Sequence, residues 1–248
     1  MANSGVNVSV RGLRKAFGSQ SVVAGLDLEI RPGEIFVLMG PSGAGKSIVL
    51  RHLIGLEEPD AGEIRVGDRP VDESIRDHIR MAMVFQSGGL LNSLSVAENV
   101  GLYLAEHRLV SRTERERLVL EKLALVGLEA GIGAKLPAEL SGGMRKRVAI
   151  ARALTMDPQL VLFDEPTSEL DPLAAGTVGR EIVALNRRLG ATTVVVTHDR
   201  DLAFGIAHRI GFLAEGRLLA LGTPAEIRAS VNARVREFLD AEFLPTTG

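Results

Sequence analysis

Hydrophobic and polar residues alternate in two short stretches near the start of the chain, at positions 6–10 and 26–30. This alternation predicts two half-buried strands of an antiparallel sheet. A turn at 31–33 then leads into the unbroken apolar run 35–39, which is typical of a strand covered on both faces. A helix is expected to begin inside 45–47 and to continue to about residue 54.

Helical periodicity replaces the strand signals from about residue 90 onward, and the stretch 115–126 is charged on one side and apolar on the other. Strand signals return at 160–163 and at 193–196, and a hairpin is expected over 210–220. This order predicts that a helical segment interrupts an α/β core.

The last apolar residues with a regular spacing are Val231, Val235, Phe238 and Leu239, which follow one another at i, i+4, i+7 and i+8. Such a spacing predicts one apolar face of a short helix. Either the chain's own core or a partner protein has to cover this face.

The composition narrows the classes of function. Hydrophobic residues make up 46% and charged residues 24% of the 248 residues, which is typical of a soluble globular protein. The net charge of −2 gives no basic field for nucleic acid, so no nucleic-acid partner is expected. Cysteine is absent, which excludes disulfides and thiolate metal sites. We find neither a signal-peptide pattern nor the ~20 consecutive apolar residues of a membrane helix, so a membrane role would require a partner.

A phosphate-binding loop is the clearest chemical motif. Residues 40–47 fit the pattern G-x-x-x-x-G-K-[ST] between the predicted strand and helix. Its members are Gly40, Pro41, Ser42, Gly43, Ala44, Gly45, Lys46 and Ser47. Glycines let backbone N–H groups turn toward phosphate oxygens, Lys46 adds charge at the β- and γ-phosphates, and the Ser47 hydroxyl reaches Mg²⁺. The alternative, a glycine-rich turn without a ligand, is disfavoured because the complete motif lies in the right context.

Two carboxylates end the apolar strand predicted at 160–163. Asp164 is placed to hold Mg²⁺, and Glu165 to orient or deprotonate an attacking water. The alternative for Glu165 is a solvated charge at a strand end, but Pro166 stops the strand directly after it. A guanine-reading N-K-x-D element is absent, which favours hydrolysis of ATP over GTP.

With these motifs and the segment 140–144 (Leu-Ser-Gly-Gly-Met) in this order, the chain resembles the ABC ATPase family over nearly its whole length. In the family, the residues that match Ser141, Gly142 and Gly143 contact the γ-phosphate held by the opposite subunit. The resemblance therefore implies a homodimer that shares two ATP sites, with ATP and Mg²⁺ as cofactors.

The resemblance also assigns four further residues. Gln86 matches the residue that touches Mg²⁺ and the attacking water and that senses the transmembrane partner, and His198 matches the switch histidine at the γ-phosphate. Asp171, in the segment 168–171, matches the loop that crosses the dimer interface. Phe17 matches the aromatic residue that stacks on adenine, with an ordinary core phenylalanine as the alternative.

Three residues depart from the family pattern. Ile48 replaces a second hydroxyl residue after the phosphate loop, which removes one expected contact to the α-phosphate. Met144 replaces a glutamine, and Glu169 replaces a small residue.

The segments 85–90, 140–147 and 235–239 resemble the ATPases of the Mla and Mce lipid transporters. This resemblance implies a peripheral subunit at the cytoplasmic face of the inner or plasma membrane. Its implied partners are a multispan permease, an MCE-domain lipid-binding protein and, in several members, a STAS-domain regulator. It also implies a C-terminal segment that reaches the partner subunit.

Two alternatives stay open. The chain could serve an ABC transporter for another cargo, since the catalytic residues do not choose the cargo. It could also be a non-transport ABC ATPase, although these usually carry two cassettes or a long coiled-coil insertion.

For the fold, the resemblance implies an α/β protein with a mostly parallel P-loop NTPase sheet, an antiparallel β subdomain and an inserted helical subdomain. We expect a single domain over 1–248. Within it, 1–89 and 155–228 form the core, 90–154 the helical subdomain and 229–248 a helical tail.

Overall fold

A six-stranded sheet forms the centre of the computed structural model, which describes residues 5–241. The strand order is β10-β9-β3-β8-β7-β6, and all neighbours run parallel except β10 and β9. The strands are β3 (Ile35–Met39), β6 (Met81–Val84), β7 (Leu160–Asp164), β8 (Thr192–Thr197), β9 (Arg209–Ala214) and β10 (Arg217–Gly222).

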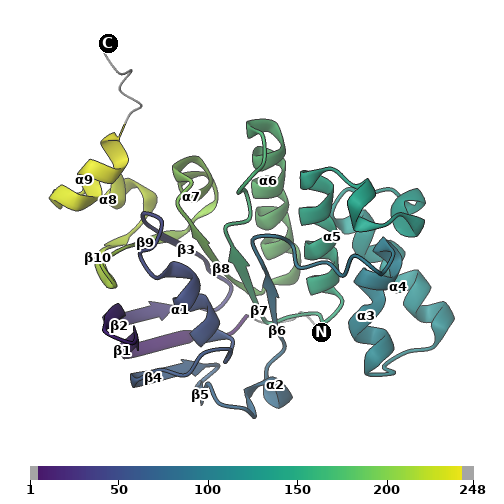
Figure 1. The fold of residues 1–248 in the computed structure, drawn as a ribbon, viewed down its shortest axis with the longest axis horizontal. Helices are drawn as coiled ribbons and strands as arrows, with labels where there is room; N and C mark the ends of the chain where they lie inside the picture. Colours follow the sequence, from purple (N-terminus) through teal and green to yellow (C-terminus); the bar gives the residue numbers. More distant parts are fainter. Residues whose placement is uncertain (1–4, 242–248) are drawn as a thin grey trace.

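A second sheet, of order β2-β1-β4-β5, is antiparallel and lies below the first in Figure 1. Val8 pairs with Ile30 on one side and with Val66 on the other, so the alternating apolar residues share one buried face. Both long strands extend well beyond the predicted stretches. The strands are β1 (Val8–Phe17), β2 (Gln20–Ile30), β4 (Ala61–Val66) and β5 (Arg69–Pro70).

The helices surround the sheets, and α3, α4 and α5 lie together at one end of the molecule (Figure 1). Serines at positions 95, 111 and 141 begin these three helices by accepting a hydrogen bond from a backbone N–H of the first turn. The helices are α1 (Lys46–Leu53), α2 (Ile75–His78), α3 (Val96–Glu106), α4 (Arg112–Leu125), α5 (Gly142–Leu154), α6 (Pro172–Leu189), α7 (Arg200–Ile206), α8 (Pro224–Arg228) and α9 (Ala233–Asp240), with 3₁₀ turns at Ala130–Ala134 and Pro137–Glu139.

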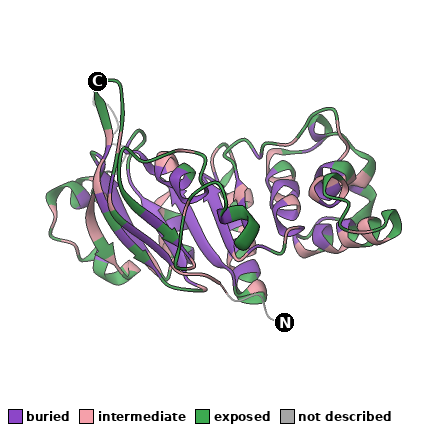
Figure 2. Ribbon diagram, turned by 90° about the horizontal axis from the view of Figure 1, so that it is seen from below, coloured by how far each residue is buried: buried purple, intermediate pink, exposed green. Residues whose placement is uncertain are grey.

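The central strand β3 divides the apolar interior into two cores. Val37 faces a core shared with helices α5 and α6, whereas Phe36 and Leu38 face a core shared with α1 and the antiparallel sheet. All five residues of β3 are buried, as Figure 2 shows for the central strands. This confirms the prediction that the run 35–39 is covered on both faces. The loop that follows β3 therefore begins at the end of a buried strand.

The apolar face of the C-terminal helix α9 packs on the chain's own core. Val235 is fully buried, and the ring of Phe238 lies 5.2 Å from that of Phe212, edge to face. Of the two alternatives, the chain's own core covers this face, and a contact of the C-terminal segment with the partner subunit stays a prediction. Val231 lies before the helix and is 97% exposed, so its assignment to the face was wrong. The rest of the predicted tail, 242–248, lies outside the described residues.

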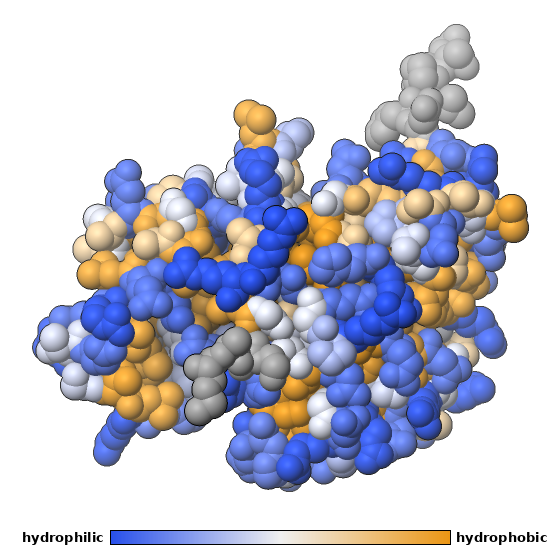
Figure 3. Space-filling model, turned by 180° about the vertical axis from the view of Figure 1, so that it is seen from behind, coloured by the Kyte–Doolittle hydropathy of each residue, from blue (hydrophilic) through white to orange (hydrophobic). Residues whose placement is uncertain are grey.

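Among residues 5–241, no helix is long and apolar enough to cross a bilayer. On the face shown in Figure 3, hydrophilic side chains separate the apolar patches from one another.

Candidate nucleotide-binding site

The predicted phosphate loop connects the buried strand β3 to helix α1. A Cβ at Gly40 would lie 2.0 Å from the Leu213 carbonyl oxygen, so only glycine fits there. Gly45 has a φ of 96°, and a Cβ added at this position would lie 2.8 Å from the carbonyl oxygen of Val22. No side chain caps the first turn of α1, so its N–H groups are available to phosphate oxygens.

Lys46 is buried at the start of α1. Its ammonium donates hydrogen bonds to the carbonyl oxygens of Gly40 (2.9 Å) and Pro41 (3.0 Å), and it lies 3.4 Å from Glu165 Oε1. Burial lowers the pKa of Lys46, and the neighbouring Glu165 carboxylate acts in the opposite direction. A polyphosphate would supply the negative charge that this buried cation favours.

Glu165 follows the last residue of β7 and has an unusual backbone conformation, with a φ of 46°. Its Oε2 accepts hydrogen bonds from Thr197 Oγ1 (3.0 Å) and from the backbone N–H of His198 (3.2 Å), and it lies 3.0 Å from His198 Nδ1. These contacts come from the end of the neighbouring strand β8. They hold the carboxylate between Lys46 and His198.

A pair of oxygen-bearing side chains is suited to Mg²⁺. Ser47 Oγ donates a hydrogen bond of 2.7 Å to Asp164 Oδ1, and burial raises the pKa of Asp164. In the part of the chain that the structure describes, no three or more His, Cys, Asp and Glu side chains gather as a metal cage. Mg²⁺ is commonly held by one or two protein oxygens together with substrate phosphates and water, so Ser47 and Asp164 fit this ion.

One cleft of about 310 Å³ brings nine of the predicted residues together. Its lining comprises Val22, Ser42, Gly43, Gly45, Lys46, Ser47, Ile48, Gln86, Glu165 and His198. A larger groove of about 680 Å³, between α6 and α7, contains neither Lys46 nor Glu165. The smaller cleft is therefore the one equipped for chemistry.

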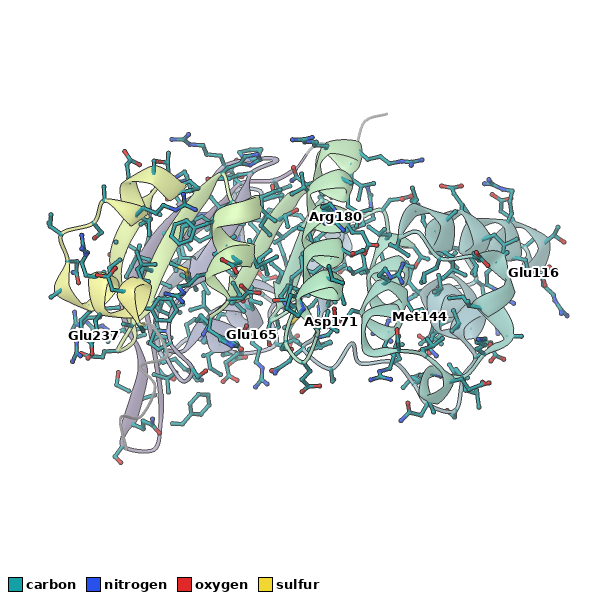
Figure 4. The ribbon with its side chains drawn as sticks, turned by 90° about the horizontal axis from the view of Figure 1, so that it is seen from above. Glu116, Met144, Glu165, Asp171, Arg180 and Glu237 are labelled. Atoms are coloured by element: carbon teal, nitrogen blue, oxygen red, sulfur yellow. The ribbon has the colours of Figure 1, made fainter. Side chains whose placement is uncertain are left out.

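The predicted residues outside this lining include Ser141, Asp171 and Phe17. Ser141 is exposed and caps α5 through a hydrogen bond from the Met144 N–H (3.2 Å), and Asp171 caps α6 through the N–H groups of residues 173 and 174. Figure 4 shows Met144 displaced from Glu165 toward the helical end of the molecule. Phe17 ends β1 and is 47% exposed, which argues against the core alternative, and the Lys15 ammonium lies 5.4 Å from its ring.

Thr197 and Lys146 both contact Glu165, and the sequence did not predict either of them. Thr197 bonds its carboxylate, and the Lys146 ammonium donates to the carbonyl oxygens of Gln86 and Glu165 (3.4 Å for Glu165) and to Ser168 Oγ (3.3 Å). Lys146 shares its helix face with buried Ala149 and Ile150 at i+3 and i+4. A lysine within the apolar stripe of a helix was the signal that could have identified it.

Comparison with known proteins identifies the family to which this site belongs. The sequence model described as ABC transporter matches residues 23–168, which is more than half of the chain. The chain belongs to the ABC transporter family. As a member, it carries the ATP-binding domain of this family.

Similar ABC proteins differ in their named cargo. The chain is 44% identical to the sn-glycerol-3-phosphate import ATP-binding protein UgpC 1 of Rhizobium johnstonii, over 89% of this chain and 59% of that protein. It is 41% identical to the Fe(3+) ions import ATP-binding protein FbpC of Rhizobium etli, over 96% of this chain and 67% of that protein. It is 38% identical to the probable ribonucleotide transport ATP-binding protein mkl of Mycobacterium tuberculosis, over 98% of this chain and 69% of that protein. The chain thus spans 59% of the length of the first relative and about two thirds of the others.

Solved ABC structures share the fold. A dimeric, post-hydrolysis structure of the ATP-binding cassette MJ0796 bound to ADP and Pi is 32% identical, with a TM-score of 0.80 over 88% of this chain and 98% of that one. The cbiO1 protein of Clostridium perfringens, part of the cbiONQ transporter complex, is 28% identical, with a TM-score of 0.82 over 90% of each chain. The predicted P-loop NTPase fold is confirmed.

Proposed function

We propose that this ABC subunit hydrolyses ATP to power lipid transport of the Mla/Mce type, as a homodimer bound to a membrane permease. The observation that carries the hydrolytic part is the convergence of Lys46, Gln86, Glu165 and His198 on one cleft, next to the Ser47–Asp164 pair. Four separate segments of the chain supply these groups. Their order along the sequence is that of the family motifs.

The geometry supports a division of roles around the γ-phosphate. The Lys46 ammonium exchanges its contact with Glu165 for phosphate oxygens, which frees the carboxylate for water. Water then attacks the γ-phosphorus, the bond to the β-phosphate oxygen breaks, and Glu165 accepts the proton of the water. His198 holds the carboxylate and lies beside the departing phosphate. Ser47 and Asp164, with Gln86 nearby, would hold Mg²⁺, which would supply positive charge to the β- and γ-phosphate oxygens.

Two observations support shared sites in a dimer. Ser141 and Asp171 are exposed and lie outside the lining of their own cleft, and the related MJ0796 cassette is dimeric. Each ATP is then held between Lys46 of one chain and Ser141 to Gly143 of the other, with Phe17 stacked on adenine. ATP-driven closure moves the helical subdomain, 90–154, against the core, 1–89 and 155–228, and the surface around Gln86 transmits this movement to the permease at the cytoplasmic face of the membrane.

The lipid cargo rests on the sequence segments 85–90, 140–147 and 235–239, which resemble Mla and Mce ATPases. The catalytic residues do not choose the cargo, and the named relatives are ATP-binding proteins for sn-glycerol-3-phosphate import, Fe(3+) ions import and probable ribonucleotide transport. The partners therefore decide the cargo. An MCE-domain lipid-binding protein and a STAS-domain regulator are the proposed additional partners.

The test is affinity purification of the protein from gently solubilised native membranes, followed by mass spectrometry. A multispan permease together with an MCE-domain protein is the expected result. A permease with a soluble binding protein for another solute would overturn the lipid cargo and keep the transport role. Absence of any membrane partner would overturn the transport role and favour a non-transport ATPase.

A further inference from the structure

Lys146 on helix α5 is a buried cation whose partners are neutral oxygens. The residue is 6% exposed, and its ammonium contacts the backbone oxygens of Gln86 and Glu165 and the hydroxyl of Ser168. A lysine ammonium has three N–H donors, so these three acceptors match its full capacity. Burying a charged group is unfavourable unless its bonds are satisfied, and an apolar residue would suit the helix face better. The position of this cation therefore requires an explanation other than packing.

The contact to Glu165 fixes the backbone of the residue that we assign as the catalytic base. Its φ of 46° lies in the left-handed region, where the backbone of any residue other than glycine is strained. The carbonyl oxygen of Glu165 accepts from Lys146 and from Ser168 Oγ (2.9 Å), and its N–H donates to Val196 (2.9 Å). Both peptide groups that flank this residue are thus held in place. The direction of the carboxylate follows from that backbone geometry.

The Lys146 ammonium bonds to three separate segments of the chain, each of which has a different proposed role in ATP hydrolysis. Gln86 follows strand β6, Glu165 follows β7, and Ser168 begins the loop that leads to Asp171. Lys146 itself lies five residues after Ser141, about 7.5 Å along the same helix, so a shift of the Ser141 end of α5 shifts the ammonium with it. A single side chain therefore connects one nucleotide cleft to the segment that is exposed outside it.

We propose that Lys146 is a positioning residue that couples the two shared ATP sites of the dimer through its contacts to Gln86, Glu165 and Ser168. This inference rests on the proposed function, because it requires that Ser141 completes the site of the opposite chain. Engagement of Ser141 by the partner's nucleotide moves α5, and Lys146 transmits that movement to the base and to Gln86. Lys146 does not contact the phosphate loop, so it acts on turnover and cooperativity and not on the binding of ATP to one chain.

The test compares Lys146→Met with Lys122→Met in steady-state hydrolysis of MgATP and in binding of a fluorescent ATP analogue. Lys122 is a matched control: it is 7% exposed, lies on α4 and pairs with Asp157 at 2.9 Å, away from the cleft. We expect Lys146→Met to lose about 100-fold in kcat through misplacement of the base. Its affinity for the analogue stays that of the wild type, and its Hill coefficient falls from nearly two, the number of sites, to about 1. Lys122→Met lowers the unfolding midpoint but leaves kcat and the Hill coefficient unchanged.

Two further variants keep the test decisive if Lys146→Met does not fold. Lys146→Arg retains donors at the site and is expected to recover most of the turnover, and Ser168→Ala removes one acceptor and is expected to lower kcat at unchanged affinity for the analogue. If Lys146→Met behaves like Lys122→Met, or if Ser168→Ala keeps the kcat and the Hill coefficient of the wild type, the coupling role is wrong. An inactive wild-type protein would instead refute the proposed function itself.

Discussion

Glu181 on helix α6 is predicted to make the stability of this protein depend on pH. Its side chain is 14% exposed, its Oε2 is buried without a hydrogen-bond partner, and its Oε1 lies 4.0 Å from Arg147 Nη1. Burial raises its pKa from 4.5 to about 7, while Arg147 and Arg180 act in the opposite direction. Figure 4 labels Arg180 on helix α6, and Glu181 is the next residue in the sequence.

The sign follows from the direction of the shift. Because the pKa is higher in the folded state, this carboxyl contributes stability that is fully present below pH 4.5 and lost as the pH rises through about 7. One pKa unit corresponds to 1.36 kcal/mol, so ionisation of Glu181 should remove about 2–3 kcal/mol between pH 5 and pH 8. Glu181→Gln cannot ionise, so its stability relative to the wild type should increase by that amount over the same interval.

The assay is urea unfolding of both proteins at pH 5, 6, 7 and 8. Glu116→Gln on α4 is the control, because this glutamate is 61% exposed and pairs with Arg112 at the surface. Its substitution should change the free energy of unfolding by less than about 0.5 kcal/mol at every pH. A difference between Glu181→Gln and the wild type that stays constant from pH 5 to pH 8 would refute the reasoning.

Three further predictions concern the proposed nucleotide-binding residues. Glu165→Gln should bind ATP like the wild type and lose about 10²–10⁴-fold in phosphate release, since it removes the proton acceptor; phosphate release near the wild-type rate would contradict this role. Lys46→Ala should lose nucleotide binding, measured by fluorescence of a labelled ATP, because the cation at the β- and γ-phosphates is gone; retained affinity would exclude this role. Phe17→Ala should weaken ATP and GTP binding alike by about 1–3 kcal/mol, because stacking tolerates any base; titration with both nucleotides tests it, and an unchanged affinity would remove Phe17 from the site.

The sequence predicted the parts of the fold that local patterns control. The uniform run 35–39 and the complete loop 40–47 give a buried strand, a tight turn and a helix start in consecutive positions, so their structure follows from local constraints. Strand β6 was not predicted, because Met81–Val84 is short and gains its strand conformation from pairing with β7, far along the chain. Val231 was assigned to the C-terminal apolar face by spacing alone, but the helix begins only after Asn232 caps it.

The residues of the site also divide into those that local sequence motifs predict and those whose contacts depend on long-range packing. Motif positions placed Lys46, Glu165 and His198 in one cleft without knowledge of the sheet. The contacts of Lys146 could not be predicted, because they depend on how α5 packs against the ends of β6 and β7. The buried state of Glu181 likewise arises from the packing of α5 against α6, and periodicity does not report the hydrogen bonds of a single oxygen.

The shared-site dimer is the central claim, and light scattering coupled to size-exclusion chromatography tests it directly. The Glu165→Gln protein, loaded with ATP and Mg²⁺, should elute with twice the 26.5 kDa mass of the chain, and the addition of Ser141→Arg should return it to one chain mass while ATP still binds. A Glu165→Gln protein that stays at one chain mass with ATP bound, or a dimer that persists with Ser141→Arg, would contradict the account.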